Sequence, residues 1–219
     1  MKNLKKQIQV KEIETRLLKT YGEQRCFLNY STPFQLLVAT ILSAQCTDKT
    51  VNLVTPKLFQ RWPDVASMAG CDIQELEKII HPCGFFHAKA KHIRASAEVI
   101  QEKYHGVVPS SMKDLTSLPG VGRKTANVVL SHAFESPGLP VDTHVKRIVK
   151  RLGITKETDP VKIESCLCRL LPPKEWSCFS LLLITHGRAC CTARNPSCSS
   201  CPIENCSYLK KSKKTAIVT

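Results

Sequence analysis

Residues 115–130 read LTSLPGVGRKTANVVL. The pattern predicts a helix, a tight turn containing Gly120 and Gly122, and a second helix that carries Arg123 and Lys124 in its first turn. Glycines allow backbone conformations that a side chain would block, and the free amides at a helix start attract anions. The helix dipole disfavours basic residues there, so two of them indicate a negatively charged partner. The alternative is an ordinary helical hairpin with a glycine turn.

The rest of the chain is also helical in pattern. Thr32, Pro33 and Gln35 are typical of a helix start, with an N-cap threonine, a proline at the first helical position and a glutamine that closes a capping box. Patterns typical of strands are nearly absent, and there is no internal repeat. We therefore predict an all-α fold, with further helices near residues 48–60, 73–80, 88–104, 112–118, 123–134, 143–151, 160–170 and 175–186.

The net charge points to a polyanionic partner. The chain has 32 Lys and Arg against 18 Asp and Glu, a formal net charge of +14. Nucleic acid is the commonest partner for such a surplus, although membrane surfaces and acidic proteins attract the same charge. No apolar stretch is long enough to span a bilayer, and the start lacks the pattern of a signal peptide. If the source is bacterial, we expect a cytoplasmic, nucleoid-associated protein that binds no membrane. The basic tail at residues 210–219 is expected to be solvated, with loose contact to phosphates as the alternative.

Twelve cysteines in a reducing compartment need an explanation other than disulfides. Cys191, Cys198, Cys201 and Cys206 follow the spacing C-x6-C-x2-C-x4-C, which lets four thiolates wrap one metal centre. The spacing leaves both zinc and a [4Fe–4S] cluster open, and the single close pair favours iron–sulfur. The other eight are predicted to be buried free thiols that pack as small hydrophobes. These are Cys26, Cys46, Cys71, Cys83, Cys166, Cys168, Cys178 and Cys190.

In a chain of this charge, the glycine hairpin resembles the helix–hairpin–helix element of DNA repair glycosylases, which binds phosphates and reads no sequence. Eighteen residues after Lys124, residues 141–144 read VDTH, and this pair of motifs resembles the endonuclease III family. The resemblance implies that Lys124 is the nucleophile and Asp142 its electrostatic partner at the lesion. Without the resemblance, Lys124 would be interpreted as a phosphate contact and Asp142 as a helix N-cap.

The implied chemistry explains both residue types. Cleavage of an N-glycosidic bond builds positive charge on the sugar, which a nearby carboxylate such as Asp142 stabilises. Lys124 must attack as a neutral amine, whereas a free lysine is neutral only about once in 2,500 at pH 7. Burial near other cations would lower that pKa. Once the imine forms, the 3′ phosphate leaves by β-elimination, so Lys124 separates a bifunctional enzyme from a monofunctional one.

The resemblance to endonuclease III extends into the cysteine loop, where residues 185–198 read THGRACCTARNPSC. It implies a [4Fe–4S] cluster held by the four cysteines, structural and facing DNA. The family usually has five residues between the third and fourth cysteines, whereas this chain has four. Cys206 is nevertheless the implied fourth ligand, because no cysteine follows it. Cys190 competes for the first position, and Cys191 is chosen because it gives the family's six-residue gap.

The same loop and two others are implied to contact DNA. Asn195 and Ser197 stand where the family often has basic residues, which leaves Arg194 as the main phosphate contact of the cysteine loop. A glycosylase must also flip its target nucleotide and fill the gap. Gln45 is the implied filler and Phe85 the implied wedge, although Phe85 or Phe86 could equally belong to the core.

His144 and the basic residues that follow it on the predicted helix near residues 143–151 have two interpretations. His144 could contact a phosphate or be a partly buried histidine at the helix start. Lys146, Arg147, Lys150 and Arg151 would suit either the DNA backbone or solvent.

The resemblance implies two helical domains with a groove between them. A six-helix domain spans residues 26–136, and a discontinuous iron–sulfur domain joins residues 1–25 to residues 137–219. The implied function is a monomeric DNA glycosylase and AP lyase that acts on double-stranded DNA with damaged pyrimidines or abasic sites. The alternatives are a monofunctional adenine glycosylase, which normally lacks the lysine at position 124, and a non-enzymatic DNA-binding protein built around zinc.

Overall fold

The structure is a computed structural model that describes residues 2–209, so the basic segment 210–219 lies outside the described residues. These residues divide into two compact units. One is continuous over residues 26–136, and the other joins the residues up to 25 to those from 137 onward. Residues 2–209 form helices and loops without a strand, which confirms the predicted all-α fold. No helix among them is long and apolar enough to cross a membrane.

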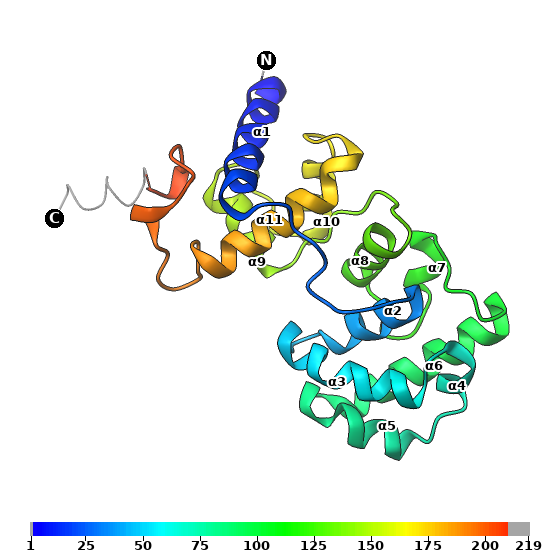
Figure 1. The fold of residues 1–219 in the computed structure, drawn as a ribbon. Helices are drawn as coiled ribbons and strands as arrows, with labels where there is room; N and C mark the ends of the chain where they lie inside the picture. The colour runs from blue at the N-terminus through cyan, green and yellow to red at the C-terminus, as the bar shows by residue number, and fades with distance from the viewer. Residues whose placement is uncertain (1, 210–219) are drawn as a thin grey trace. The chain divides into compact units, whose positions relative to one another are not determined.

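The continuous unit contains seven α-helices (Figure 1), one more than predicted. The additional helix is α4 (Val65–Ala69), which a capping box between Asp64 and Ser67 begins. The other elements are α2 (Pro33–Leu42), α3 (Asp48–Arg61), α5 (Ile73–Ile80), the 3-10 helix η1 (His81–Cys83), α6 (Phe86–Tyr104), α7 (Met112–Thr116) and α8 (Arg123–Ala133).

Helix α2 is the buried centre of this unit. The predicted N-cap is present, because the Gln35 amide donates to the Thr32 hydroxyl at 3.2 Å. The Gln35 side chain accepts from the Ser31 amide at 2.8 Å and not from that of Thr32, so the predicted capping box does not form. Every residue from Leu36 to Leu42 is buried, and α2 packs against α3, α6 and α8. Helix α8, which carries Lys124, is therefore anchored directly on the core.

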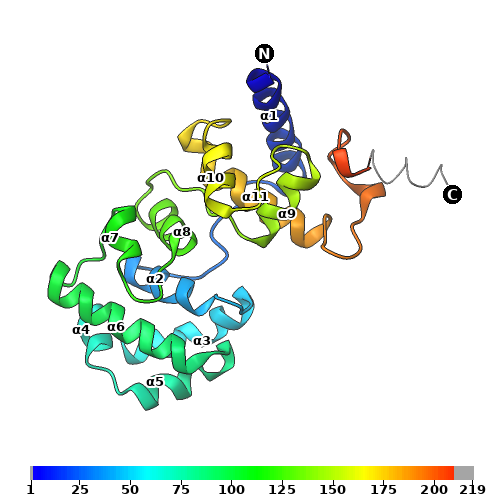
Figure 2. The ribbon, with the colours of Figure 1, turned by 180° about the vertical axis from the view of Figure 1, so that it is seen from behind.

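The discontinuous unit is organised around α11 (Trp176–Ala189), which packs against α1 (Lys2–Tyr21) and α9 (Thr143–Arg151). Figures 1 and 2 show these three helices together from opposite sides. The N-terminal helix is fixed by polar contacts as well: the Tyr21 hydroxyl lies 3.0 Å from His186 Nδ1, and Lys11 pairs with Glu175 at 2.8 Å. The remaining elements are α10 (Pro160–Cys168) and the 3-10 helices η2 (Pro173–Glu175) and η3 (Cys198–Ser200).

All twelve cysteines are free thiols. Among the eight outside the C-x6-C-x2-C-x4-C motif, Cys71, Cys83 and Cys190 are buried as predicted, whereas the other five are only half-buried. The prediction of full burial was therefore wrong for those five. A thiol is small and only weakly polar, so it is tolerated where core meets surface.

Candidate functional site

The glycine hairpin connects α7 and α8 through a turn with one conformationally demanding residue. Gly120 has φ +74°, and a Cβ placed there would lie 2.7 Å from the side chain of His92. The turn is held by the Ser96 hydroxyl, which donates to the Pro119 carbonyl at 2.7 Å, and by the buried side chain of Val121. Only glycine fits position 120 without strain.

The start of α8 is open toward solvent. Gly122 is the N-cap in an extended conformation, no side chain caps the helix there, and a Cβ on Gly122 would meet nothing within 4 Å. The sequence argument that a side chain would be blocked is therefore right for Gly120 and wrong for Gly122. Arg123 and Lys124 are exposed in the first turn. An uncapped helix start with glycine at its edge can admit a phosphate close to the backbone.

Lys124 is exposed within its own unit, on the face of α8 near Cys26. Burial raises the pKa of the Cys26 thiol, and the positive charge of Lys124 acts in the opposite direction. The burial near other cations that the sequence argument invoked is not a feature of the 26–136 unit. The exposed Lys124 amine is accessible to a substrate, whose bound atoms would then surround it.

Asp142 belongs to the discontinuous unit and is the N-cap of α9. Its Oδ1 accepts a hydrogen bond from the Val145 amide at 2.8 Å, and the side chain is half-buried. Two residues on, His144 is also half-buried, and its Nδ1 lies 3.1 Å from Arg147 Nη2. Burial lowers the pKa of His144, which the Asp142 carboxylate partly opposes. Capping fixes the orientation of the Asp142 carboxylate at a helix start.

Gln45 and Phe85 share an unusual backbone conformation. Both have positive φ, +52° and +48°, and both are exposed. The Phe85 side chain is 67% exposed, whereas that of Phe86 packs on the core and lies 4.6 Å from the His81 ring. The structure thus distinguishes the two phenylalanines, either of which could have belonged to the core: Phe86 packs against the core, and Phe85, the implied wedge, lies at the surface.

The four cysteines of the motif line one small cavity together with Cys190 and His186. Within the described residues, the ligand atoms of His186, Cys190 and Cys201 lie within 4.8 Å of one another. His186 lies outside the cysteine motif that predicted the metal site. Its signal is the spacing of four residues to Cys190, which places both side chains on one face at the end of α11.

The donor set of this cavity suits an iron–sulfur cluster. Five thiols, those of the motif and of Cys190, line one space, and four thiolates are the ligand set that such clusters take. Burial raises the pKa of the Cys201 thiol to about 12, so this sulfur becomes a thiolate at neutral pH only when a metal coordinates it. His186, which is buried beside Cys201, has its pKa lowered to about 4 by burial and is neutral at pH 7.

Two arginines of α9 hold the cysteine loop. Arg151 donates to the carbonyls of Thr192 and Ala193 at 2.6 and 2.9 Å and to Cys191 Sγ at 3.2 Å. Arg147 donates to the Cys191 carbonyl at 3.0 Å. The sequence suggested DNA backbone or solvent for these arginines, and both instead fix the loop to the helix that Asp142 begins. Arg194, the predicted phosphate contact, is exposed in that loop.

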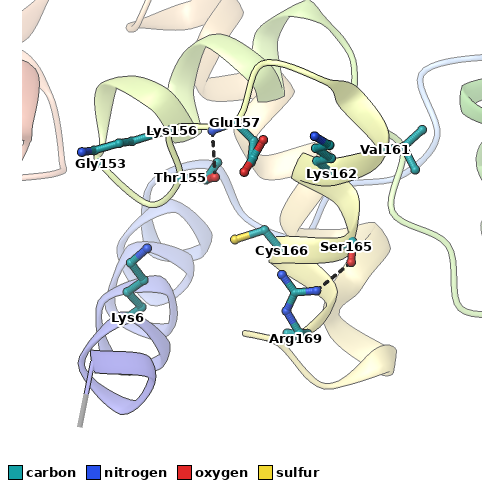
Figure 3. A pocket seen from close by; sticks show the side chains of 10 residues that line it. All are labelled: Lys6, Gly153, Thr155, Lys156, Glu157, Val161, Lys162, Ser165, Cys166 and Arg169. Carbon is teal, nitrogen blue, oxygen red and sulfur yellow. Dashed lines mark hydrogen bonds between the residues drawn. The ribbon is translucent and has the colours of Figure 1, made fainter.

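A basic hollow of about 850 Å³ lies elsewhere in the discontinuous unit, between α1 and the segment around α10 (Figure 3). Two of its cations are engaged with the protein: Lys6 donates to the Ile154 carbonyl at 2.8 Å, and Arg169 donates to the Ser165 hydroxyl at 2.8 Å. None of the predicted catalytic or metal-binding residues lines it. The candidate site therefore follows from the chemistry of its residues and not from this hollow.

Comparison with known proteins places the chain. Residues 38–173 match the HhH-GPD superfamily of base excision DNA repair proteins, and residues 191–205 match the iron–sulfur binding domain of endonuclease III. An endonuclease III from Synechocystis sp. is 55% identical over 193 residues, covering 88% of each chain. The chain belongs to the endonuclease III family. Endonuclease III is a DNA glycosylase with AP lyase activity, so this protein is an enzyme of base excision repair.

Solved structures of endonuclease III agree with this assignment. A non-covalent endonuclease III–DNA complex matches with a TM-score of 0.90 and 38% identity, over 95% of this chain and 98% of that one. A trapped covalent endonuclease III–DNA intermediate also matches with a TM-score of 0.90, at 39% identity, over 94% of this chain and 98% of that one. The predicted family, fold class, DNA binding and [4Fe–4S] cluster are confirmed, while the roles of individual residues stay predictions.

Proposed function

We propose that this endonuclease III removes oxidised pyrimidines from double-stranded DNA and cleaves the strand 3′ to the abasic site, acting as a monomer, with Lys124 as nucleophile. The observation that carries the proposal is the exposed Lys124 in the uncapped first turn of α8, directly after the glycine turn. The endonuclease III trapped as a covalent DNA intermediate, 39% identical to this chain, supports a covalent route. No other residue type in that turn could form an imine with a sugar.

The mechanism assigns a separate step to each of two residues. The Asp142 carboxylate stabilises the positive charge that develops on the sugar as the N-glycosidic bond breaks. The neutral Lys124 amine attacks C1′, and the base leaves with the electron pair of that bond. After the ring opens to an imine, loss of a C2′ proton expels the 3′ phosphate. The Val145 amide, bound to Asp142 Oδ1, holds the carboxylate in place throughout.

We assign DNA binding to the exposed loops. The backbone at Gly120 and Gly122, with Arg123, binds phosphates at the start of α8, and Arg194 and His144 add phosphate contacts from the other unit. Gln45 fills the gap left by the flipped nucleotide. Phe85 is the wedge, a role supported by its exposure and its left-handed backbone.

We assign the cluster to Cys191, Cys198, Cys201 and Cys206. The match to the iron–sulfur domain begins at residue 191, which supports Cys191 over Cys190 as the first ligand. It ends at residue 205, one position before Cys206, but Cys206 lines the same cavity as the other three. When bound, the cluster cross-links the loop, and neither base removal nor elimination requires an electron from it.

Borohydride trapping tests the nucleophile. Purified protein is mixed with a duplex carrying one oxidised pyrimidine, and borohydride is added to reduce any imine. The wild type and the Lys113→Ala variant, which removes an exposed lysine from the first helix of the same hairpin, are expected to give a covalent adduct. Lys124→Ala is expected to give none. A wild type that binds the duplex with its cluster loaded and yields no adduct would overturn the proposal.

A further inference from the structure

Lys89 is a lysine buried in the interior of the 26–136 unit. It is the fourth residue of α6, its side chain is 5% exposed, and its Nζ donates to the carbonyls of Leu42 and Cys83, each at 2.8 Å. The ionisable groups that influence it are the thiols of Cys46 and Cys83, and burial lowers the pKa of Lys89. The ammonium is thus held by neutral carbonyls and not by a carboxylate.

The two carbonyls end two different elements. Leu42 is the last residue of α2, and Cys83 is the last residue of η1. The chain then enters the Gln45 loop (residues 43–47) after α2 and the Phe85 loop (residues 84–85) after η1. Carbonyls at the ends of helices lack partners within the helix, and a cation there is favoured by the helix dipole. One ammonium therefore caps both elements at the points where the two loops leave them.

A second contact joins the same loops. The thiol of Cys46, in the Gln45 loop, lies near that of Cys83, directly before the Phe85 loop, and after burial it is the next influence that raises the pKa of Cys83. Burial raises the pKa of Cys83 to about 11, so its proton is retained at neutral pH. The thiol pair and the Lys89 ammonium lie on the inner side of two loops whose tips, Gln45 and Phe85, are exposed.

The Lys89 contacts hold two loops whose tip residues have a strained backbone. Gln45 and Phe85 both adopt the left-handed conformation, which is strained for a residue with a side chain. Such a conformation persists only where the surroundings hold it, and it is common at functional sites. A buried ammonium bound only to carbonyls is itself costly, so stability alone gives no reason for a lysine at this position.

We infer that Lys89 is a positioning residue for nucleotide flipping: by binding the Leu42 and Cys83 carbonyls together, it holds the Gln45 loop and the Phe85 loop in register so that filler and wedge enter the duplex as one unit. The inference rests on the proposed roles of Gln45 and Phe85. It assigns to Lys89 no contact with DNA.

The test replaces Lys89 with methionine, which has a similar shape and no donor. A fluorescent 2-aminopurine beside the lesion reports unstacking, and single-turnover excision reports the chemistry that follows. Lys89→Met is expected to slow both by about 10- to 100-fold, since small misplacements near a reacting centre have effects of that size. The affinity of this variant for undamaged duplex should be unchanged. Its urea midpoint should be unchanged or higher. Lys91→Met, an exposed lysine on the same helix, should match the wild type.

Combined variants separate the outcomes. If Gln45→Ala and Phe85→Ala slow flipping while Lys89→Met flips at the wild-type rate, the inference is overturned and the proposed function stands. If neither alanine variant slows flipping, the proposed roles of the two loops fail first, and the inference with them. When Lys89→Met is added to the double alanine variant, the rates of unstacking and excision should fall by no more than about a further twofold, because Lys89 acts through those two side chains. A full multiplicative loss, or a fall in urea midpoint in proportion to activity, would show a merely structural role.

Discussion

Replacing Gly120 with alanine should destabilise the 26–136 unit by an amount that the hairpin geometry predicts. At φ +74°, a residue with a side chain costs about 1–2 kcal/mol. The new methyl group would also lie 2.7 Å from Cβ and Cγ of His92, and relief of such overpacking typically costs about 1–3 kcal/mol. The expected loss is therefore about 2–5 kcal/mol, which lowers the urea midpoint by about 1–2.5 M for a slope of about 2 kcal/mol per molar.

Gly122→Ala is the matched control, because a Cβ there meets nothing within 4 Å and the backbone is extended. The smaller entropy of its unfolded chain offsets the weaker N-cap preference of alanine, so stability should stay within about 0.5 kcal/mol. Affinity for DNA should nevertheless fall about tenfold, the equivalent of one charge-assisted hydrogen bond to a phosphate. The pair thus separates a glycine that the fold requires from one that the ligand requires.

Each unit contains one of the two tryptophans, which allows a clean assay. In a Trp176→Phe background, fluorescence of the buried Trp62 follows urea unfolding of the 26–136 unit alone. Anisotropy of a labelled duplex with an uncleavable abasic analogue gives the affinity. If Gly120→Ala unfolds at the wild-type urea concentration, or if Gly122→Ala binds DNA as tightly as the wild type, the reasoning about the hairpin is wrong.

Two further predictions concern the metal loop and pH. Cys191→Ser should lose iron and the visible absorbance of the cluster, whereas Cys190→Ser should keep both; the opposite result would make Cys190 the first ligand. Burial lowers the pKa of His132 in the folded protein. Below the unfolded value of about 6.5, the unfolded chain therefore binds a proton at this histidine more readily than the folded chain, and the free energy of unfolding decreases as the pH falls below that value. The urea midpoint of His132→Gln should therefore decrease less between about pH 7 and pH 5 than that of the wild type, and an equal decrease would contradict this account.

Local signals in the sequence predicted most of the helices because the caps are local. The hydrogen bonds of Thr32 and Asp142 join residues three positions apart, and both helices begin where those residues indicate. Helix α4 was missed, although the capping box of Asp64 and Ser67 that begins it is equally local. The glycine hairpin was predicted from its turn, but which glycine is sterically required depends on His92, which lies far away in sequence.

Long basic side chains were the least predictable part of the site. A pattern of lysines and arginines does not tell which of them turn inward, because their partners are distant carbonyls. Arg151 binds the carbonyl of Thr192, 41 positions away, and Lys89 binds that of Leu42, 47 positions away. Likewise, Phe85 and Phe86 differ only in that a left-handed backbone at position 85 directs one ring outward and leaves the other against the core.

The packing of α1 against α11 determines the order in which the two units can fold during synthesis. The Tyr21 hydroxyl meets His186, which lines the cysteine cavity, across 165 positions of chain. At a synthesis rate of about 5–20 residues per second, the first helix waits about 10–30 s for its partner. The continuous 26–136 unit, with its hairpin and Lys124, can fold within that interval. In a newly made chain, the hairpin proposed to bind DNA can therefore form before the cysteine cavity that holds the iron–sulfur cluster.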